Sequence, residues 1–423
     1  MNVGIVVILL LLLLSFMGIP IYISLGIGTL VALNMADMAL IVLPQKLFAG
    51  MNSSSLLAIP FFILAGSLMS RSITGKLIDI ANSLIGRIKG SLGVVTVLAS
   101  TLFGAISGSG VATASAIGGI TIPAMKKARY PDDFATAISS ISSILGPIIP
   151  PSIPLIVYAS VSTVSVASLF IGSVLPGVLL AGAMTVYCLI YGKKHNLPAQ
   201  QKSTGREKLL ALKNGIWALL MPIIILGGIF GGIFTPTEAA AVSVAYALLV
   251  SGFIYRDLTL RDIPQIFIET SISTATIMML VGLSKASSYV VVTSGLPQKL
   301  LDIFTSITNS KIVILLLLNL LFLIIGMLME ASAAIIMMTP ILTPILTAFN
   351  INPLTFGIMM SFNLCIGLVT PPVGLCLLVC NQIGETSLSR TIKTLFPMLV
   401  ISLIALLLVT FVPALTQWLP SIL

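Results

Sequence analysis

Long runs of apolar residues, separated by short polar segments, dominate this chain. Because the hydrocarbon core of a bilayer is about 30 Å thick, a helix of about 20 apolar residues crosses it. The first run continues past Pro20 and lacks both a preceding basic segment and a small-residue cleavage motif, so we interpret it as a span and not as a signal peptide. The apolar runs predict nine spans, at residues 3–33, 54–70, 132–160, 166–192, 214–233, 236–254, 266–292, 353–382 and 394–416.

Two further apolar stretches, 91–125 and 312–346, do not fit single spans. Each is about 35 residues long, and its middle is rich in small or irregular residues, at 104–110 and 326–332. At about 1.5 Å per residue, two arms of half that length enter a bilayer deeply without forming two full spans. We therefore interpret both stretches as re-entrant hairpins, whose irregular tips must be buried in protein or line a cavity.

The sequence also matches itself at an offset of 221 residues. Isolated identities in apolar sequence arise by chance, but matching breaks, hairpin lengths and arms together favour an internal repeat. The matching features are Pro150–Pro151 with Pro371–Pro372, Gly146 with Gly367, hairpin 91–125 with hairpin 312–346, and the amphipathic stretch 75–89 with 296–310. We expect the two amphipathic stretches to be interfacial arm helices that brace a fixed scaffold.

The composition restricts the class of protein. Of 423 residues, 57% are hydrophobic and only 8% are charged, whereas a soluble domain carries about 25% charged residues. The mean hydropathy of +1.17 points the same way. This hydropathy also argues against a transmembrane β-barrel, because the strands of a barrel alternate polar and apolar residues and are less apolar on average. The chain is therefore predicted to be an all-α polytopic membrane protein.

The positions of the basic residues predict the topology. With the N-terminus assumed to be cytoplasmic, 17 of the 21 basic residues fall inside, and four (Lys46, Lys285, Lys299 and Lys311) fall outside. This asymmetry follows the positive-inside rule. The net charge of +9 is thus interpreted as a topology signal, and nucleic-acid binding is disfavoured. In this topology the first repeat unit starts inside and the second outside, so the repeat is inverted.

The sequence lacks the residues that a membrane-embedded enzyme would need. The single histidine, His195, lies in a polar segment and is predicted to be a solvated loop residue. There is no HExxH motif and no pair of intramembrane aspartates. The cysteines all lie in apolar runs and are predicted to be buried free thiols: Cys188, Cys365, Cys376 and Cys380.

The two broken helices predict a binding site. Proline removes a backbone N–H and clashes with the preceding turn, so each Gly-x(3)-Pro-Pro break frees backbone groups near the bilayer midplane. Half-helix N-termini favour anions, while freed carbonyls and half-helix C-termini favour cations. Two hairpin tips that face two broken helices are typical of a secondary transporter, with the substrate between them and the coupling ions beside it.

Several motifs resemble those of one transporter family. They are Ile59–Gly66, Ser107–Ala112, Ile122–Met125, Gly146–Ser152, Phe234–Ala240, Gly326–Glu330 and Thr370–Gly374. On these motifs the chain resembles the large membrane subunit of the tripartite ATP-independent periplasmic (TRAP) transporters, of the dicarboxylate/sialate permease M type. One departure is Thr113, where the family commonly has an acidic residue after the first hairpin tip.

The resemblance implies an elevator-type secondary transporter with two inverted repeats, in the inner membrane of a bacterium. It implies import of a small carboxylated solute, of the sialic acid or C4-dicarboxylate class, coupled to Na⁺. The expected partners are a small four-span membrane subunit, here as a separate polypeptide, and a periplasmic substrate-binding protein. The alternative is a stand-alone Na⁺/dicarboxylate elevator symporter with similar repeats.

The sodium candidates fall into two sets of oxygen-bearing residues. The first set is Ser107, Ser109, Ser143, Gly146 and Pro147, and the second is Gly326, Met329, Gly367 and Thr370. The alternative for these small residues is close helix packing, which is common in membranes. The substrate candidates are Ser107, Gly108, Pro150, Pro151, Glu330, Pro371 and Pro372.

Two glutamates have a structural interpretation. Glu330, a carboxylate at membrane depth, either binds a cation or braces the second tip through backbone N–H groups, and bracing is favoured. Thr235–Glu238 predicts a capping box with Pro236 at the first helical position.

The predicted organisation has eight parts. They are scaffold helices at 1–74, an interfacial arm at 75–89, a first transport repeat at 90–192 with hairpin 91–125 and broken helix 132–160, a cytoplasmic loop at 193–213, scaffold helices at 214–295, a second arm at 296–310, a second transport repeat at 311–393 with hairpin 312–346 and broken helix 353–382, and a C-terminal helix at 394–423.

Overall fold

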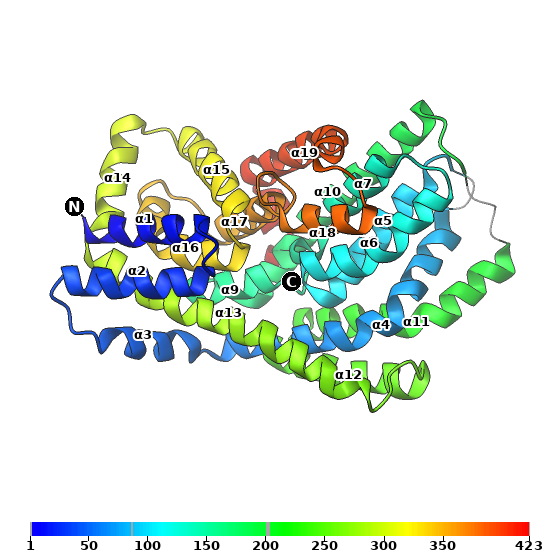
Figure 1. Cartoon of the computed structure of the whole chain (residues 1–423), viewed down its shortest axis with the longest axis horizontal. Coiled ribbons are helices and arrows are strands. Elements are labelled where there is room, and N and C mark those ends of the chain that lie inside the picture. The colour runs from blue at the N-terminus through cyan, green and yellow to red at the C-terminus, as the bar shows by residue number, and fades with distance from the viewer. Residues whose placement is uncertain (1, 86–87, 200–203, 423) are drawn as a thin grey trace.

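The computed structural model describes residues 2–85, 88–199 and 204–422, and within them every regular element is a helix (Figure 1). The first half contains α1 (Val3–Phe16), α2 (Ile21–Met35), α3 (Val42–Met51), η1 (Ser54–Leu57), α4 (Ala58–Ile85), α5 (Ser91–Ser107), α6 (Gly110–Lys127), α7 (Asp132–Ser143), α8 (Leu145–Ile148), α9 (Ile153–Val161) and α10 (Val166–Lys194). The second half contains α11 (Gly205–Phe230), α12 (Pro236–Leu249), η2 (Val250–Ile254), α13 (Asp262–Thr293), α14 (Leu296–Ile307), α15 (Lys311–Leu328), α16 (Ala331–Ala348), α17 (Pro353–Gly367), α18 (Leu375–Gly384), α19 (Leu388–Phe411), α20 (Ala414–Gln417) and η3 (Leu419–Ser421).

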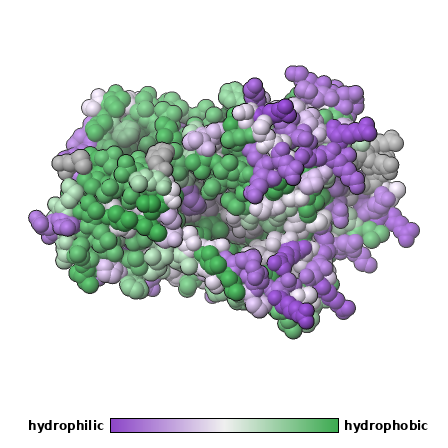
Figure 2. All heavy atoms as spheres, viewed as in Figure 1, coloured by the Kyte–Doolittle hydropathy of each residue, from purple (hydrophilic) through white to green (hydrophobic). Residues whose placement is uncertain are grey.

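Within the described ranges, eight helices are long and apolar enough to cross a membrane, and a bent pair with a 40° angle, 132–148 and 153–161, makes a ninth. The prediction of an all-helical polytopic membrane protein is therefore confirmed. Figure 2 shows polar side chains gathered at the end of the molecule where α10 ends and α11 begins, while the rest of this face is mainly apolar. This separation matches a protein whose charged residues lie mostly at one membrane surface.

The predicted span at 3–33 is wrong, because the chain turns back in its middle. Gly18 has a φ of +82°, and Pro20 precedes the first residue of α2. α1 and α2 then pack side by side, so closely that a Cβ on Gly28 would lie 3.3 Å from the Val7 carbonyl oxygen. Hydropathy detects the apolar length of such a pair but not the turn inside it.

The assumed side of the N-terminus is also wrong. The Asn2 side chain donates to the Ser294 carbonyl oxygen over 3.0 Å, just beyond the end of α13. Arg71 instead pairs with Asp262, at the start of α13, over 2.7 Å. Since α13 has 32 residues, these contacts lie at opposite ends of a long helix. The N-terminus therefore lies at the end opposite Arg71.

Three predicted boundaries also differ from the structure. The arm at 75–89 is not separate, because α4 continues through Gly75 to Ile85, whereas the chain before α14 turns at Gly295, with a φ of +71°. The loop at 193–213 is shorter, because a capping box of Thr204 and Glu207 starts α11 at residue 205. The last long helix starts at residue 388 and not at 394. Residues 86–87 of the predicted arm and 200–203 of the predicted loop lie outside the described residues.

Two helix pairs and two broken helices form one half of the molecule. α5 and α6 meet at Gly108–Ser109, and α15 and α16 meet at Met329–Glu330. The first broken helix consists of α7, α8 and α9, and the second of α17 and α18, and each break contains a cis Pro-Pro bond, Pro150–Pro151 or Pro371–Pro372.

The two repeats interlock. α9, which follows the first break, packs against α16 of the second hairpin, and α18, which follows the second break, packs against α6 of the first. At the second of these contacts, a Cβ on Gly118 would lie 3.5 Å from the Cys380 sulfur. In Figure 1, α2, α3, α4, α12 and α13 run together along one side of this pair of repeats. We call this layer, with α1 and α11, the scaffold.

Candidate functional site

The first hairpin tip lies directly against the first break. A Cβ on Gly108 would lie 2.6 Å from the Pro151 carbonyl oxygen, and a Cβ on Gly146 would lie 2.7 Å from the Ser109 carbonyl oxygen. Side-chain carbons do not approach backbone so closely, so both positions require glycine. Gly108 also has a left-handed φ of +62°. The structure thus brings together four of the predicted site residues, two from the tip and two from the break.

Hydroxyl groups gather at this contact. Thr113 Oγ1 donates to the Ser109 carbonyl oxygen over 2.7 Å and lies 3.4 Å from Ser107 Oγ. A Cβ on Gly146 would lie only 2.6 Å from that threonine oxygen. Thr113 is therefore the centre of the first tip, although sequence reasoning noted it only as a departure from the family pattern.

The facing break supplies buried polar groups. Ser143 Oγ donates to the Ser140 carbonyl oxygen over 2.7 Å. Ser152 Oγ donates to the Pro147 carbonyl oxygen over 2.5 Å and accepts from the backbone N–H of Leu155 at the start of α9. Because hydroxyl and carbonyl oxygens each carry a second lone pair, these bonds leave acceptor capacity at the break.

The second tip and second break meet in the same way. A Cβ on Gly367 would lie 2.4 Å from the Gly326 carbonyl oxygen. Thr370 Oγ1 donates to the Ile366 carbonyl oxygen over 2.7 Å. Pro371 and Pro372 lie between α17 and α18, and Pro372 is exposed. A cavity of about 120 Å³ adjoins this tip, and its lining includes Gly326, Met329, Glu330, Leu368, Val373 and Gly374.

Glu330 caps α16. Its carboxylate accepts from the backbone N–H groups of Ser332, over 2.8 Å, and Ala333, over 3.2 Å, and from Ser332 Oγ over 2.9 Å. The structure therefore shows the hydrogen bonds to backbone N–H groups on which the predicted bracing role depends. The capping box at Thr235 and Glu238 is confirmed.

The two tip regions adjoin each other. A Cβ on Gly110, at the start of α6, would lie 3.1 Å from the Cys376 sulfur and 3.3 Å from Leu368 Cδ1. The first tip therefore touches the second break. At each tip one helix ends and another begins, so carbonyl and amide ends of helix dipoles lie within one small region.

A cavity of about 700 Å³ opens beside the first tip, between the hairpin and the scaffold, and we call it the inner cavity. Ser107 and Ser109 line it on the hairpin side, and Arg71 of α4 lines it on the scaffold side. Its other polar lining residues are Ser67, Ser70, Thr74, Ser115 and Ser273.

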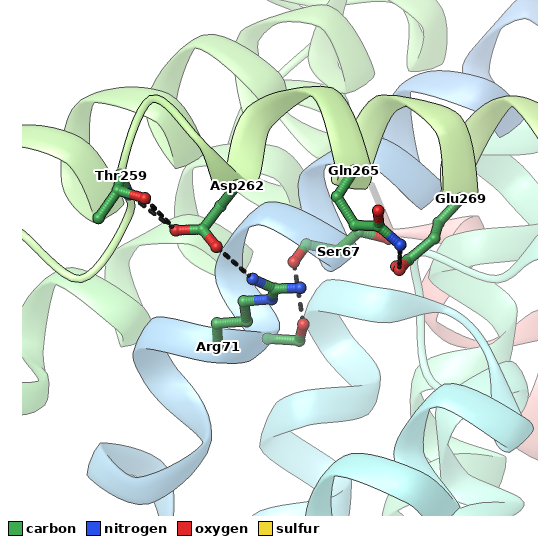
Figure 3. Close-up of polar contacts among 7 residues, drawn as sticks. Ser67, Arg71, Thr259, Asp262, Gln265 and Glu269 are labelled. Atoms are coloured by element: carbon green, nitrogen blue, oxygen red, sulfur yellow. Dashed lines mark hydrogen bonds and ion pairs between the residues drawn. The ribbon is translucent and has the colours of Figure 1, made fainter.

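Arg71 is held by hydrogen bonds at the rim of the inner cavity (Figure 3). Its Nη1 lies 2.7 Å from Asp262 Oδ1, and Asp262 Oδ2 accepts from Thr259 Oγ1 over 2.6 Å. On the same face of α13, Gln265 Nε2 donates to Glu269 Oε1 over 2.9 Å. The Arg71 side chain remains 46% exposed, so this ion pair orients the guanidinium more than it stabilises the fold.

Sequence reasoning missed Arg71 because it sought cations at the hairpin tips. Arg71 lies on the scaffold helix α4 and reaches the first tip only across the inner cavity. The signal was present nonetheless: Arg71 is the first charged residue after Lys46 and directly follows the mainly apolar first half of α4.

Two hairpin tips that meet two broken helices, beside a cavity shared with a separate scaffold, define a helical secondary transporter. The family model of the tripartite ATP-independent periplasmic transporter, DctM component, matches residues 6–415. The chain belongs to this family of TRAP transporter large permeases. It is therefore a multi-span transporter subunit of the bacterial inner membrane and not an enzyme.

Several curated relatives match over nearly the whole chain. The sialic acid TRAP transporter large permease SiaM of Vibrio cholerae is 39% identical over 97% of this chain and 96% of its own length. The C4-dicarboxylate large permease DctM of Pseudomonas aeruginosa is 40% identical over 94% of each chain. The isethionate TRAP transporter permease DctMQ of Oleidesulfovibrio alaskensis is 36% identical over 95% of this chain and 64% of its own length.

A solved structure shares the fold at much lower identity. The YdaH transporter of Alcanivorax borkumensis has a TM-score of 0.58 and 17% identity, and the match covers 90% of this chain and 87% of that one. This likeness supports the arrangement of helices and carries no statement about substrate.

Proposed function

We propose that this chain is the translocating subunit of a sodium-coupled TRAP transporter that imports a small carboxylated solute by an elevator movement. The observation that carries the proposal is the contact between the first tip and the first break, around Ser109, Thr113 and Gly146, at the edge of the inner cavity. Relatives named for sialic acid and for C4-dicarboxylates are almost equally similar, at 39% and 40% identity. We therefore propose that the solute is a small carboxylate, of either the sialic acid or the C4-dicarboxylate class.

The oxygen atoms at both tips suit Na⁺. A hard cation prefers hydroxyl, carbonyl and water oxygens, and freed carbonyls at half-helix ends hold Na⁺ in inverted-repeat transporters. Ser107, Ser109 and Thr113 supply such oxygens at the first tip, with Ser143, Gly146 and Pro147 opposite them. The second set is the carbonyl groups of Gly326, Met329 and Gly367, with the Thr370 hydroxyl.

The substrate anion needs donors, and two kinds are available. The N-termini of α6 and α9, which begin at Gly110 and Ile153, present amide groups where the first tip meets the first break. Gly108, Pro150 and Pro151 shape the backbone at this contact. From the opposite wall of the inner cavity, the planar Arg71 guanidinium matches a carboxylate in two parallel hydrogen bonds. Glu330 already accepts three hydrogen bonds, so it braces the second tip while Pro371 and Pro372 shape the break.

An elevator movement fits the division of the molecule into two bodies. The interlocked repeats form one body, and the scaffold forms the other, with the inner cavity between them. In the topology predicted from the basic residues, the Arg71 end of the cavity faces the cytoplasm. This supports an inward-facing state for the present structure.

The family is tripartite, so the complete system needs a small membrane subunit and a periplasmic binding protein. We propose that the small subunit is a four-span partner of the scaffold and that the binding protein delivers the solute. The test is uptake into proteoliposomes that hold this chain with both partners under an imposed Na⁺ gradient. Omission of the gradient, the small subunit or the loaded binding protein should abolish uptake, and uptake by this chain alone would instead establish a stand-alone symporter.

The sodium sites have their own test. Ser109→Ala and Thr370→Ala should each raise the Na⁺ concentration for half-maximal uptake, because each removes one hydroxyl oxygen from a proposed ion site. Thr101→Ala is the control, because its hydroxyl lies on α5 and donates to the Val97 carbonyl oxygen within the helix. If neither site variant differs from the control in Na⁺ dependence, the proposed ligands are wrong.

A further inference from the structure

A second large cavity lies away from both tips. It has a volume of about 760 Å³ and is lined by the end of α9, the second half of α16, the start of α17 and one scaffold residue, Lys285 of α13. We call it the outer cavity, because Lys285 falls on the outer side in the topology predicted from the basic residues. It contains none of the residues assigned above to the sodium sites or the substrate site.

Lys285 is the only charged residue that lines the outer cavity in the described chain. Its side chain is exposed, on a helix whose neighbouring residues Ser284 and Ala286 are buried. Because an ammonium group is strongly hydrated, its position in a cavity shared with the moving repeats favours an anionic or water-rich occupant over an apolar one.

Two other basic groups lie near this cavity. Lys311 Nζ donates to the carbonyl oxygen of Asn350, which is a lining residue, over 2.6 Å. Lys46 Nζ lies 4.1 Å from the ring centre of Tyr289, one helical turn after Lys285. Lys285 thus lines the cavity, Lys311 bonds to one of its lining residues, and Lys46 lies beside the next turn of α13, although the positive-inside rule makes basic residues rare on that side.

The polar lining suits a small organic acid. Thr339, Thr343 and Thr347 donate their hydroxyl protons to carbonyl oxygens one turn earlier on α16. Their remaining lone pairs can accept hydrogen bonds from water or from hydroxyl groups of a solute. A carboxylate therefore finds its main donor at Lys285, while the rest of the wall accepts hydrogen bonds from the rest of the solute.

We propose that the outer cavity is a capture site, in which Lys285 binds the carboxylate of the solute before it reaches the site between the tips. This inference rests on the proposed direction and class of transport. It assigns to the fixed scaffold a binding residue on each side of the moving repeats, Lys285 outside and Arg71 inside. Capture near Lys285 raises the local concentration of an anion released by a binding protein.

Binding is tested without transport, on the purified chain in nanodiscs of neutral lipid. A water-soluble amine-acylating reagent is added, and acylation of Lys285 and of Lys299 is followed by peptide mass spectrometry, with succinate or N-acetylneuraminate as the probe. At ten times the half-protecting concentration, either probe should slow acylation of Lys285 about tenfold and leave Lys299, on α14, unchanged. Equal rates with and without both probes would overturn the proposal.

The phosphate of a lipid headgroup also carries a negative charge. A third labelling experiment therefore distinguishes a lipid headgroup from a carboxylate solute as the ligand of Lys285. Nanodiscs that contain phosphatidylglycerol are labelled without any probe. If the lipid protects Lys285 and neither carboxylate does, the cavity binds a headgroup and the proposal is overturned. Protection by a carboxylate in neutral lipid supports it, and this result stands whether or not the transport assay succeeds.

The transport arm uses the complete system in proteoliposomes. Lys285→Met should raise the concentration of loaded binding protein for half-maximal uptake about tenfold, because a charge-assisted hydrogen bond is lost. Lys285→Arg keeps the positive charge and should leave this concentration close to that of the unchanged protein. Lys299→Met is the matched control. Unchanged half-saturation in Lys285→Met would contradict capture, and a change in Na⁺ dependence alone would assign Lys285 to ion coupling instead.

Discussion

Glycine at position 146 decides how closely the first tip approaches its break. A Cβ there would lie 2.6 Å from Thr113 Oγ1 and 2.7 Å from the Ser109 carbonyl oxygen. We expect Gly146→Ala to force these groups apart, at a cost of about 1–3 kcal/mol for overpacking, and to reduce Na⁺-driven uptake at least tenfold. Gly119→Ala on α6 meets no atom within 4 Å and is the control. Uptake by Gly146→Ala at the level of this control would show that the contact is not required.

Two variants of Glu330 distinguish a bracing role of its carboxylate from a role in ion binding. If the carboxylate only caps α16, Glu330→Gln keeps an acceptor for Ser332 and Ala333 and should change the melting temperature little. Glu330→Ala removes the cap and should lower stability by about 1 kcal/mol. Both variants are compared by thermal melting in detergent and by the Na⁺ dependence of uptake. A large loss of Na⁺ affinity in the stable Gln variant would contradict the bracing role.

The sequence predicts caps well at this scale because they depend on residues three apart in the chain. Thr235 and Glu238 form such a capping box, and the four cysteines are buried and unpaired, as their apolar surroundings predicted. The roles of Thr113 and Arg71 could not be predicted in the same way. Each depends on a partner from another element, Gly146 for Thr113 and the first tip for Arg71.

At the scale of elements, hydropathy located the long helices but not the turns within apolar runs. The run at 3–33 contains a turn made by Gly18 and Pro20, and its two helices are 14 and 15 residues long. The repeat at an offset of 221 residues was visible because Gly and Pro positions persist in both halves. The arms differ between the halves because Gly75 is helical in one, while Gly295 turns the chain in the other.

The α1–α2 pair makes a prediction about the N-terminus. Asn2 lies beside Ser294, at the end of α13 that we place outside. In intact cells, a membrane-impermeant maleimide should therefore label Asn2→Cys and the reference Lys299→Cys. His195→Cys, at the end of α10, should be labelled only after lysis. If Asn2→Cys behaves like His195→Cys, the two-helix arrangement does not form in the membrane.

At the scale of the whole molecule, the residues proposed to bind Na⁺ lie on the repeats, whereas the two proposed cationic residues, Arg71 and Lys285, lie on the scaffold. Each repeat supplies a tip and a break, but each break's second half packs on the other repeat, so neither repeat can move alone. The inner and outer cavities both lie where this interlocked body faces the scaffold. No pattern within a single segment predicts these cavities, because their walls come from helices far apart in the sequence.

Movement of the repeats against the scaffold can be tested with a disulfide. A Cβ on Gly66 of α4 would lie 3.4 Å from Ser107 Cβ, close to the distance that a disulfide needs. In a background without the four native cysteines, oxidation of Gly66→Cys/Ser107→Cys should stop uptake, and reduction should restore it to the level before oxidation.

The control pair, Gly28→Cys/Leu10→Cys, joins α1 to α2 within the scaffold, with a Cβ–Cβ distance of 3.7 Å. Oxidation of this pair should leave uptake intact, since both residues belong to the fixed body. If uptake continues after complete cross-linking of Gly66→Cys to Ser107→Cys, the first tip does not move relative to α4 and the elevator movement is wrong.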